Sequence, residues 1–204
     1  MMYKLIKICY RLISYPFRMI RSATKPFLNF WLPNLRFFVS KRIKHKGKVI
    51  CNQKMLLTGL GNIQIGKNGV FGYKLGGFYR GGSIELQPRY KKAIIKIGDN
   101  VATNNNIFLC AANYIEIGSD TLIGQNVTIM DFEAHATDPK KRREVGEIGK
   151  VILGNNIWVG NNVTILKNTS IGDNSIIAAG AVVKGDFPSN VIIGGVPAKV
   201  IKKI

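Results

Sequence analysis

Residues 153–183 read LGNNIWVGNNVTILKNTSIGDNSIIAAGAVV, and an aliphatic residue returns in this stretch at every sixth position. The repeated residues are Leu153, Val159, Ile165, Ile171, Ile177 and Val183. A six-residue period fits neither an α-helix, with about 3.6 residues per turn, nor a strand that alternates about every 2 residues. Each hexad is therefore predicted to form a short strand and a turn, with three hexads in each triangular coil and the aliphatic side chain inside.

The same phase continues upstream at Ile65, Ile97, Ile117 and Ile123, each followed by Gly. We therefore expect coils over most of residues 60–196. The repeat is lost at residues 72–96 and 130–151, and insertions into a solenoid emerge as loops that often carry function. The predicted organisation is a basic N-terminal arm, residues 1–48, followed by a β-helix domain, residues 49–204.

The closing segment, residues 157–160 (IWVG) through residues 193–201 (IGGVPAKVI), carries a family resemblance. Over about residues 60–204 the chain resembles the hexapeptide-repeat acyltransferases, which are left-handed parallel β-helices. The resemblance implies an all-β solenoid, a homotrimer with each active site between neighbouring subunits, and acetyl-CoA as the acyl donor.

The basic arm holds 12 of the 30 Lys and Arg residues, and the first acidic residue of the chain is Glu85. Apolar residues recur in it at helical spacing, from Leu5 to Ile20, which predicts a basic amphipathic helix. The aromatic run of residues 27–32 is expected to be irregular or interfacial. Three interpretations remain open: binding of residues 1–45 to an anionic membrane surface, a helical cap on the solenoid, and nucleic-acid binding. The membrane interpretation is preferred because it explains both the apolar and the basic face, and no recognition motif supports nucleic acid.

The arm lacks the run of about 20 apolar residues that a spanning helix needs and has no secretory cleavage site. The three cysteines match no metal or redox motif, and their odd number favours reduced thiols. We therefore expect a cytoplasmic protein, peripheral at the inner face of the cell membrane.

His135 is one of two histidines and stands in the second interruption. The other, His45, lies in a basic run and is expected to be incidental. Hexapeptide acyltransferases carry their catalytic histidine in a loop at the place that matches His135. An imidazole that titrates near neutrality suits removal of a proton from an attacking hydroxyl. Asp131 and Glu133 either orient this imidazole or are solvated loop acids, and Asp131 is also a candidate for acceptor binding.

Asn104 matches the asparagine that holds the acceptor hydroxyl in galactoside-type and maltose-type acetyltransferases. Its amide can donate and accept, but three consecutive asparagines also suit a turn. The Gly-rich residues 76–82 carry two aromatic side chains, which either stack on a sugar or cover a coil edge.

The resemblance places acetyl-CoA in a groove near the C-terminus. The residues that it implies for donor binding are Trp158, Gly160, Asn161, Ala179, Gly180, Lys184, Lys199 and Lys202. Lys184 departs from the family pattern by one position, so its contact with phosphate is in doubt.

No metal is expected, because a γ-type carbonic anhydrase needs three histidines per zinc. The predicted function is transfer of an acetyl group from acetyl-CoA to a sugar hydroxyl, free or in a lipid-linked glycan, in the assembly of a surface polysaccharide. The alternatives are a soluble small-molecule acceptor, an amino group as the acceptor, and a non-catalytic membrane-associated scaffold.

Overall fold

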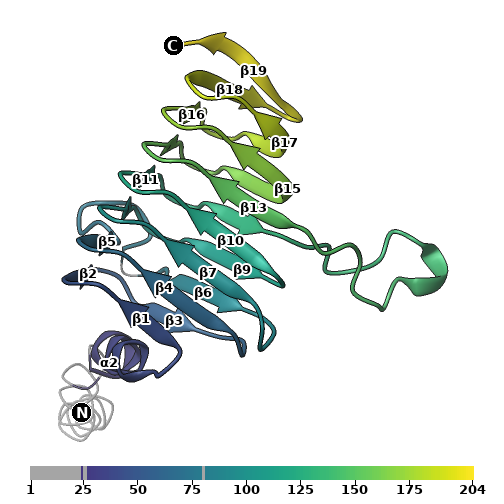
Figure 1. The fold of residues 1–204 in the computed structure, drawn as a ribbon. Coiled ribbons are helices and arrows are strands. Elements are labelled where there is room, and N and C mark those ends of the chain that lie inside the picture. The colour runs from purple at the N-terminus through teal and green to yellow at the C-terminus, as the bar shows by residue number, and fades with distance from the viewer. Residues whose placement is uncertain (1–23, 25–26, 80) are drawn as a thin grey trace, which may run out of the picture.

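The computed structural model describes Thr24 and residues 27–204 with the exception of Arg80. It is a left-handed parallel β-helix, as predicted, with three strand-bearing faces that rise from the N-terminal to the C-terminal end (Figure 1). The first face holds β1 (Ile43–His45), β4 (Asn62–Ile65), β7 (Ile94–Ile97), β10 (Tyr114–Ile117) and β13 (Lys150–Leu153). The second face holds β2 (Val49–Cys51), β5 (Gly69–Phe71), β8 (Ala102–Thr103), β11 (Leu122–Ile123), β14 (Trp158–Val159), β16 (Ile176–Ile177), β18 (Val191–Gly195) and β19 (Ala198–Lys203).

The third face holds β3 (Met55–Leu57), β6 (Ile84–Pro88), β9 (Phe108–Ala111) and β12 (Thr128–Met130). Near the C-terminal end, β15 (Thr164–Ile171) turns the corner from the third face to the first, because its start pairs with β12 and its end with β13. β17 (Val182–Phe187) follows β15 around the same corner. Among the described strands, the terminal pair of β18 and β19 is antiparallel, and the other strand pairs are parallel.

The six repeated aliphatic side chains of residues 153–183 point inward, and none is more than 2% exposed. Burial of one such side chain stabilises the fold by about 1.5–3 kcal/mol, so the hexad phase determines which face of each strand is inside. The turn asparagines stack in ladders along the corners. Asn106 donates to Asn126 and Asn126 donates to Asn162, each over 2.8 Å. All three have positive φ, which Asn tolerates better than most residues.

The aromatic run of residues 27–32 is helical rather than irregular. A π-helical turn, η1 (Phe27–Trp31), leads into α2 (Leu32–Val39), in which Pro33 occupies the first turn. Phe37 of α2 is buried against the first coil, and Asn34 accepts a hydrogen bond from the Met55 N–H over 2.7 Å. A solenoid needs its open end covered, and α2 does this at the N-terminal end.

The predicted boundary at residues 48 and 49 therefore lies inside the first coil, because β1 pairs with β4 before that point. The expected amphipathic helix of the first 20 residues lies outside the described residues. Among the residues that are described, no helix is long and apolar enough to cross a bilayer.

The two interruptions differ in form. The first is shorter than predicted, since the chain is irregular only over residues 72–83 before β6 and β7 restore the coil. The second, residues 131–149, is a narrow two-stranded ribbon with a short 3-10 turn, η2 (Pro139–Lys141), at its tip. We call this segment the ribbon. It projects far from the body of the β-helix (Figure 1).

Candidate functional site

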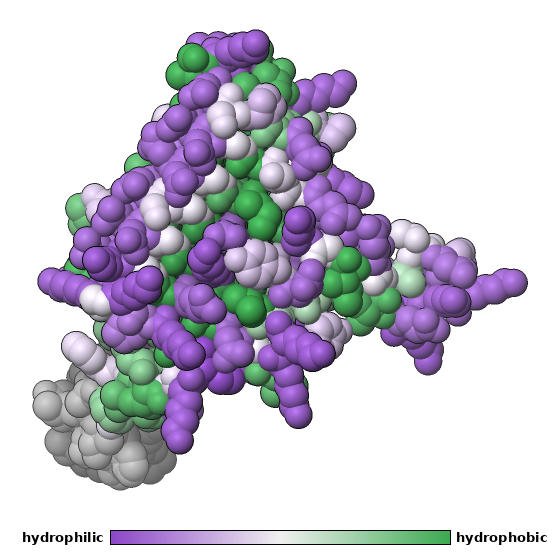
Figure 2. Space-filling view, viewed as in Figure 1, coloured by the Kyte–Doolittle hydropathy of each residue, from purple (hydrophilic) through white to green (hydrophobic). Residues whose placement is uncertain are grey.

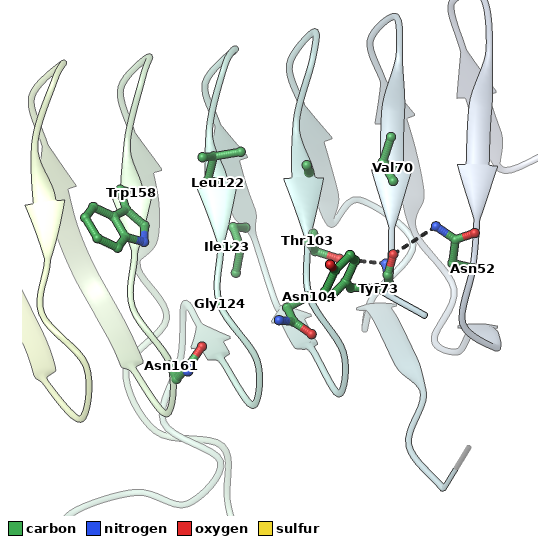
Figure 3. Close-up of a pocket in the computed structure, with 12 residues that line it drawn as sticks. Asn52, Val70, Tyr73, Thr103, Asn104, Leu122, Ile123, Gly124, Trp158 and Asn161 are labelled. Carbon is green, nitrogen blue, oxygen red and sulfur yellow. Dashed lines mark hydrogen bonds between the residues drawn. The ribbon is translucent and has the colours of Figure 1, made fainter. Parts of the chain in front are cut away.

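A cleft of about 370 Å³ crosses the second face, and we call it the central cleft (Figure 3). It runs from β14 at one end to β2 at the other, along the corner where the second face meets the third. Its lining consists of Asn52, Val70, Gly72, Tyr73, Ala102, Thr103, Asn104, Leu122, Ile123, Gly124, Trp158 and Asn161. The cleft thus contains two of the residues predicted for the donor, Trp158 and Asn161, and one of the two predicted for the acceptor, Asn104.

Trp158 lies at one end of the central cleft on β14, where its indole is 57% exposed. The adjacent residue on β11 is Leu122, which is also exposed. Large apolar side chains that face outward on two neighbouring strands form a surface suited to an apolar or aromatic group.

The predicted small residues gather at this end as well. A Cβ on Gly160 would come within 2.6 Å of the Ala179 nitrogen, so only Gly lets these two coils approach. Gly180 donates its N–H to the Asn161 carbonyl over 2.9 Å. The four residues therefore form one contiguous corner below Trp158.

The predicted cations divide between two places. Lys199 and Lys202 are exposed on β19, which continues the second face beyond β16 and β18. Lys184 lies on β17 at a different corner, where the third face meets the first, and its charge acts on Glu147 of the ribbon. Within one chain the structure does not bring Lys184 to the Trp158 end of the cleft.

Asn104 stands midway along the central cleft, beside Thr103 (Figure 3). Its Oδ1 atom accepts the Asn105 N–H over 2.8 Å. Its amide nitrogen is directed along the cleft toward Asn161, and so it can serve as a donor to a ligand (Figure 3).

Two buried amides that sequence reasoning missed shape this part of the cleft. Asn105 is fully buried and bonds to both the N–H and the carbonyl of Tyr73 and to the carbonyl of Gly77. Gln53 donates to the Phe78 carbonyl over 2.8 Å. Together they hold residues 73–78 against the corner. Asn105 could have been found from the sequence, because the alternation of inward and outward residues that runs through β8 puts this polar residue at an inward position.

Asp131 is a correction to the prediction. Its side chain is fully buried and accepts three backbone N–H groups, from Ala112, Asn113 and Tyr114, over 2.6–2.9 Å. Burial raises the pKa of this carboxyl group, while the three N–H groups oppose that shift. Both oxygens are occupied in a turn of the preceding coil, so Asp131 neither binds an acceptor nor orients the imidazole.

His135 lies on the ribbon, where its side chain is exposed. Its Nδ1 atom is 2.9 Å from the carbonyl oxygen of Arg142 on the opposite side of the ribbon. A carbonyl oxygen only accepts hydrogen bonds, so in the neutral ring the proton is on Nδ1 and the lone pair is on Nε2. A backbone carbonyl, not an acid, therefore orients the ring.

The base of the ribbon is held by an ion cluster. Lys167 of β15, whose side chain is 5% exposed, contacts Glu133 over 3.2 Å and also contacts Glu147. Glu133 and Glu147 lie on the two sides of the ribbon, which also pair through the Glu133 N–H and the Glu147 carbonyl over 2.9 Å. Glu133 therefore anchors the ribbon and does not contact the imidazole. Lys167 was not predicted as a site residue. The signal for it is its position in β15, where the alternation of the strand makes it an inward-pointing residue.

The ribbon and the central cleft lie on different sides of the chain. The ribbon leaves the corner between the third and first faces, since it joins β12 to β13. The cleft lies at the corner between the second and third faces. Figure 1 shows the ribbon projecting away from the side that carries β5 and β11. One chain therefore does not bring His135 to its own central cleft.

The described cysteines are poor nucleophiles. Burial raises the pKa of Cys51 to about 12 and that of Cys110 to about 11, so neither forms a thiolate at neutral pH. The described part of the chain also contains no group of three or more His, Cys, Asp or Glu residues that could hold a metal ion.

Comparisons with known proteins agree with this architecture. The family model for bacterial transferase hexapeptide (six repeats) matches residues 150–185. The putative lipopolysaccharide biosynthesis O-acetyl transferase WbbJ of Escherichia coli K12 is 35% identical over 152 residues, which is 70% of this chain and 72% of WbbJ.

Two solved structures are similar as well. A galactoside acetyltransferase in complex with coenzyme A is 38% identical, with a TM-score of 0.51, over 54% of this chain and 55% of that one. The chain thus spans about half the length of that enzyme. A maltose O-acetyltransferase from Clostridium difficile 630 is 27% identical, with a TM-score of 0.54, over 80% of this chain and 71% of that one.

The repeat, the fold and an identity of 35% with WbbJ over more than two thirds of both chains lead to one assignment. This chain belongs to the hexapeptide-repeat family of acyl-CoA-dependent acyltransferases.

Proposed function

We propose that this protein transfers the acetyl group of acetyl-CoA to a hydroxyl of a sugar during assembly of a surface polysaccharide, with His135 as the general base. The observation that carries this proposal is the contact of 2.9 Å between His135 Nδ1 and the Arg142 carbonyl. In the neutral ring this contact selects the tautomer with the lone pair on Nε2 of an exposed side chain, which is the tautomer that a base at this nitrogen requires.

The chemistry is a direct transfer. Nε2 removes the proton of the acceptor hydroxyl as its oxygen attacks the thioester carbonyl. The tetrahedral intermediate collapses, the carbon–sulfur bond breaks, and the imidazolium returns the proton to the departing thiolate. The raised pKa values of Cys51 and Cys110 support a route without an acyl-enzyme intermediate.

The second face suits the donor. We place the pantetheine arm along the corner of Gly160, Asn161, Ala179 and Gly180, beside the exposed indole of Trp158. Lys199 and Lys202, farther along the same face, are placed to meet the nucleotide phosphates.

We propose a homotrimer in which the ribbon of one subunit covers the central cleft of the next. Placement of His135 and the cleft at different corners supports this assembly, since the two meet only between chains. Lys184 stands at the ribbon's corner and would then approach the neighbour's donor.

The proposed acceptor is a sugar hydroxyl near Asn104. Similarity to WbbJ, whose name refers to lipopolysaccharide biosynthesis, supports a surface polysaccharide as its source.

We also propose that the protein acts at the inner face of the cell membrane. Helices η1 and α2 expose Leu28, Trp31, Leu35 and Val39, each more than half exposed, while the 12 cations of residues 1–48 face no acid in that segment. Because α2 caps the β-helix, removal of residues 1–23 alone tests the arm without uncovering the core. The truncated protein loses five of the 12 cations but keeps η1 and α2, so it should sediment more weakly with phosphatidylserine vesicles. Undiminished sedimentation would contradict a membrane role for residues 1–23.

The test of the base compares both histidines. His135→Ala should lower kcat by about 10²–10⁴-fold, because general-base catalysis is lost, and should leave coenzyme A binding unchanged. His45→Ala is the matched control, since His45 Nδ1 also contacts a carbonyl, that of Gly47, over 3.1 Å. Transfer of labelled acetyl groups and calorimetry with coenzyme A measure the two effects. Equal activity of the two variants would reject His135 as the base.

A further inference from the structure

A second hollow, the helix groove, lies between the N-terminal helices and residues 73–79. It has a volume of about 530 Å³ and is lined by Phe30, Trp31, Asn34, Leu35, Phe38, Cys51, Asn52, Lys74 and Tyr79. Figure 2 shows apolar side chains at the surface over α2, at the foot of the molecule. No residue of the helix groove is acidic.

The helix groove adjoins the central cleft. Asn52 lines both, and the chain passes from Tyr73 in the cleft directly to Lys74 in the groove. Figure 3 shows Asn52 and Tyr73 at the end of the cleft that is farthest from Trp158. A molecule that places a hydroxyl near Asn104 can therefore extend past Asn52 into the helix groove.

The side chains that line the two hollows change in character from the central cleft to the helix groove. Around Asn104 the walls carry amide and hydroxyl groups. Lys74, the residue after Tyr73, lines the groove together with Asn52, whose Nδ2 already donates to the Gly72 carbonyl. Beyond it the walls are Phe30, Trp31, Leu35, Phe38 and Tyr79, which offer apolar and aromatic surface.

The side-chain amides that line the groove already make hydrogen bonds within the chain. Asn34 is buried, and its amide is used by Met55 and Gln53 of the first coil. Sugar hydroxyls left without partners against the aromatic wall would lose the hydrogen bonds that they make with water. An alkyl or isoprenoid chain has no such cost and gains about 0.8 kcal/mol for each buried methylene.

We infer that the helix groove binds the lipid chain of a phosphate-linked lipid acceptor, with its sugar in the central cleft and its phosphate at Lys74. The order of sugar, phosphate and lipid in such a molecule matches the order of Asn104 in the cleft, Lys74 at the entrance of the groove and the aromatic side chains inside it. This inference deepens the proposed function, on which its biological meaning rests, by naming the acceptor class.

The test measures binding, so its result does not depend on acetyl transfer. The probe is farnesyl phosphate, with farnesol and inorganic phosphate as its two halves. In a Trp158→Phe background Trp31 is the only tryptophan, so quenching of its fluorescence reports occupancy of the groove. Farnesyl phosphate should quench Trp31 saturably, whereas inorganic phosphate should not.

Two variants separate the parts of the site. Leu35→Asp, at a side chain that is 56% exposed, should weaken farnesyl phosphate at least about tenfold, because a charge replaces apolar wall. Leu60→Asp, at a side chain that is 60% exposed outside the groove, is its control and should bind as before. Lys74→Gln should weaken farnesyl phosphate but not farnesol, while Lys67→Gln should change neither.

Absence of saturable quenching, or equal quenching in Leu35→Asp and the unchanged chain, would overturn the inference. Equal affinity of farnesol and farnesyl phosphate in the unchanged chain would overturn the phosphate site at Lys74. A failure of the proposed function has a different signature, namely loss of acetyl transfer to every hydroxyl acceptor with quenching intact.

Discussion

Two inactive variants, His135→Ala and Trp158→Ala, should recover activity when they are combined in one oligomer. His135 lies on the ribbon, at the corner between the third and first faces, and Trp158 lies on the second face. If each active site joins the ribbon of one subunit to the cleft of the next, an interface between unlike subunits can contain both intact residues. Both side chains are exposed, so neither change should unfold the chain.

The size of the recovery follows from the proposed geometry. A mixed trimer holds the two variants in a ratio of two to one, and in either arrangement a single interface joins an intact His135 to an intact Trp158. We therefore expect about a third of the wild-type kcat per trimer, because a ring of identical contacts has one site at each interface. The His135→Ala homotrimer should be slower than wild type by about 10²–10⁴-fold, because its general base is lost. Recovery of about a third of the wild-type kcat is therefore easily detected.

The assay is co-expression of the two variants with different affinity tags, followed by purification over both tags and measurement of labelled acetyl transfer. His135→Ala combined with the double variant His135→Ala/Trp158→Ala is the matched control and should stay inactive, because no intact base is present. A mixed oligomer no faster than its parents would refute the shared site, since every chain would then need both residues itself.

Three further predictions concern the ribbon and its corner. Asp131→Asn should lower the free energy of unfolding by about 1–3 kcal/mol, because either orientation of the amide turns its NH2 group toward a backbone donor; denaturant unfolding measures this, and the exposed Asp120→Asn should change it little. Lys167→Met should lower kcat about tenfold or more and speed tryptic cleavage at the basic ribbon tip, with coenzyme A binding unchanged, because the base of the ribbon loses its ion cluster; the exposed Lys150→Met is the control, and equal cleavage rates would argue against the anchor. Hydrogen bonding from Lys167 holds the pKa of Glu147 below its ordinary value of 4.5, so this pair stabilises the ribbon above that pH and the stabilisation is lost as the pH falls; amide exchange at Glu133, corrected for intrinsic rates, should show less protection at pH values below about 4 than at neutrality.

The β-helix could be predicted from sequence because its information is local and periodic. A hexad places one side chain inside each short strand, and the same register recurs from Leu153 to Val183 without a shift in phase. The turn asparagines could be predicted for the same reason. The cap formed by α2 was only one of three interpretations of the basic arm, because no repeat in residues 27–39 identifies the open end of the solenoid as their partner.

The candidate site was less predictable, since its parts meet only in three dimensions. Asp131 begins a loop, where a carboxylate is commonly solvated, but here three N–H groups from the preceding coil converge on it. The partner of His135 is a carbonyl seven residues farther along, which the pairing of the ribbon brings opposite. Neither contact can be recognised from the order of residue types in the sequence.

The two segments that leave the β-helix are held in opposite ways, and this contrast bears on how the site is assembled. Residues 73–78 are held against their own chain by the amides of Gln53 and Asn105, so Tyr73 lines the central cleft of the same subunit. The ribbon is fixed at its base by Lys167, and its outer part, which carries His135, projects from the body (Figure 1). A flat solenoid face becomes an enclosed site only when something covers it. In the proposed trimer one subunit would supply the floor and one wall, and the projecting ribbon is the element suited to supply the base from its neighbour.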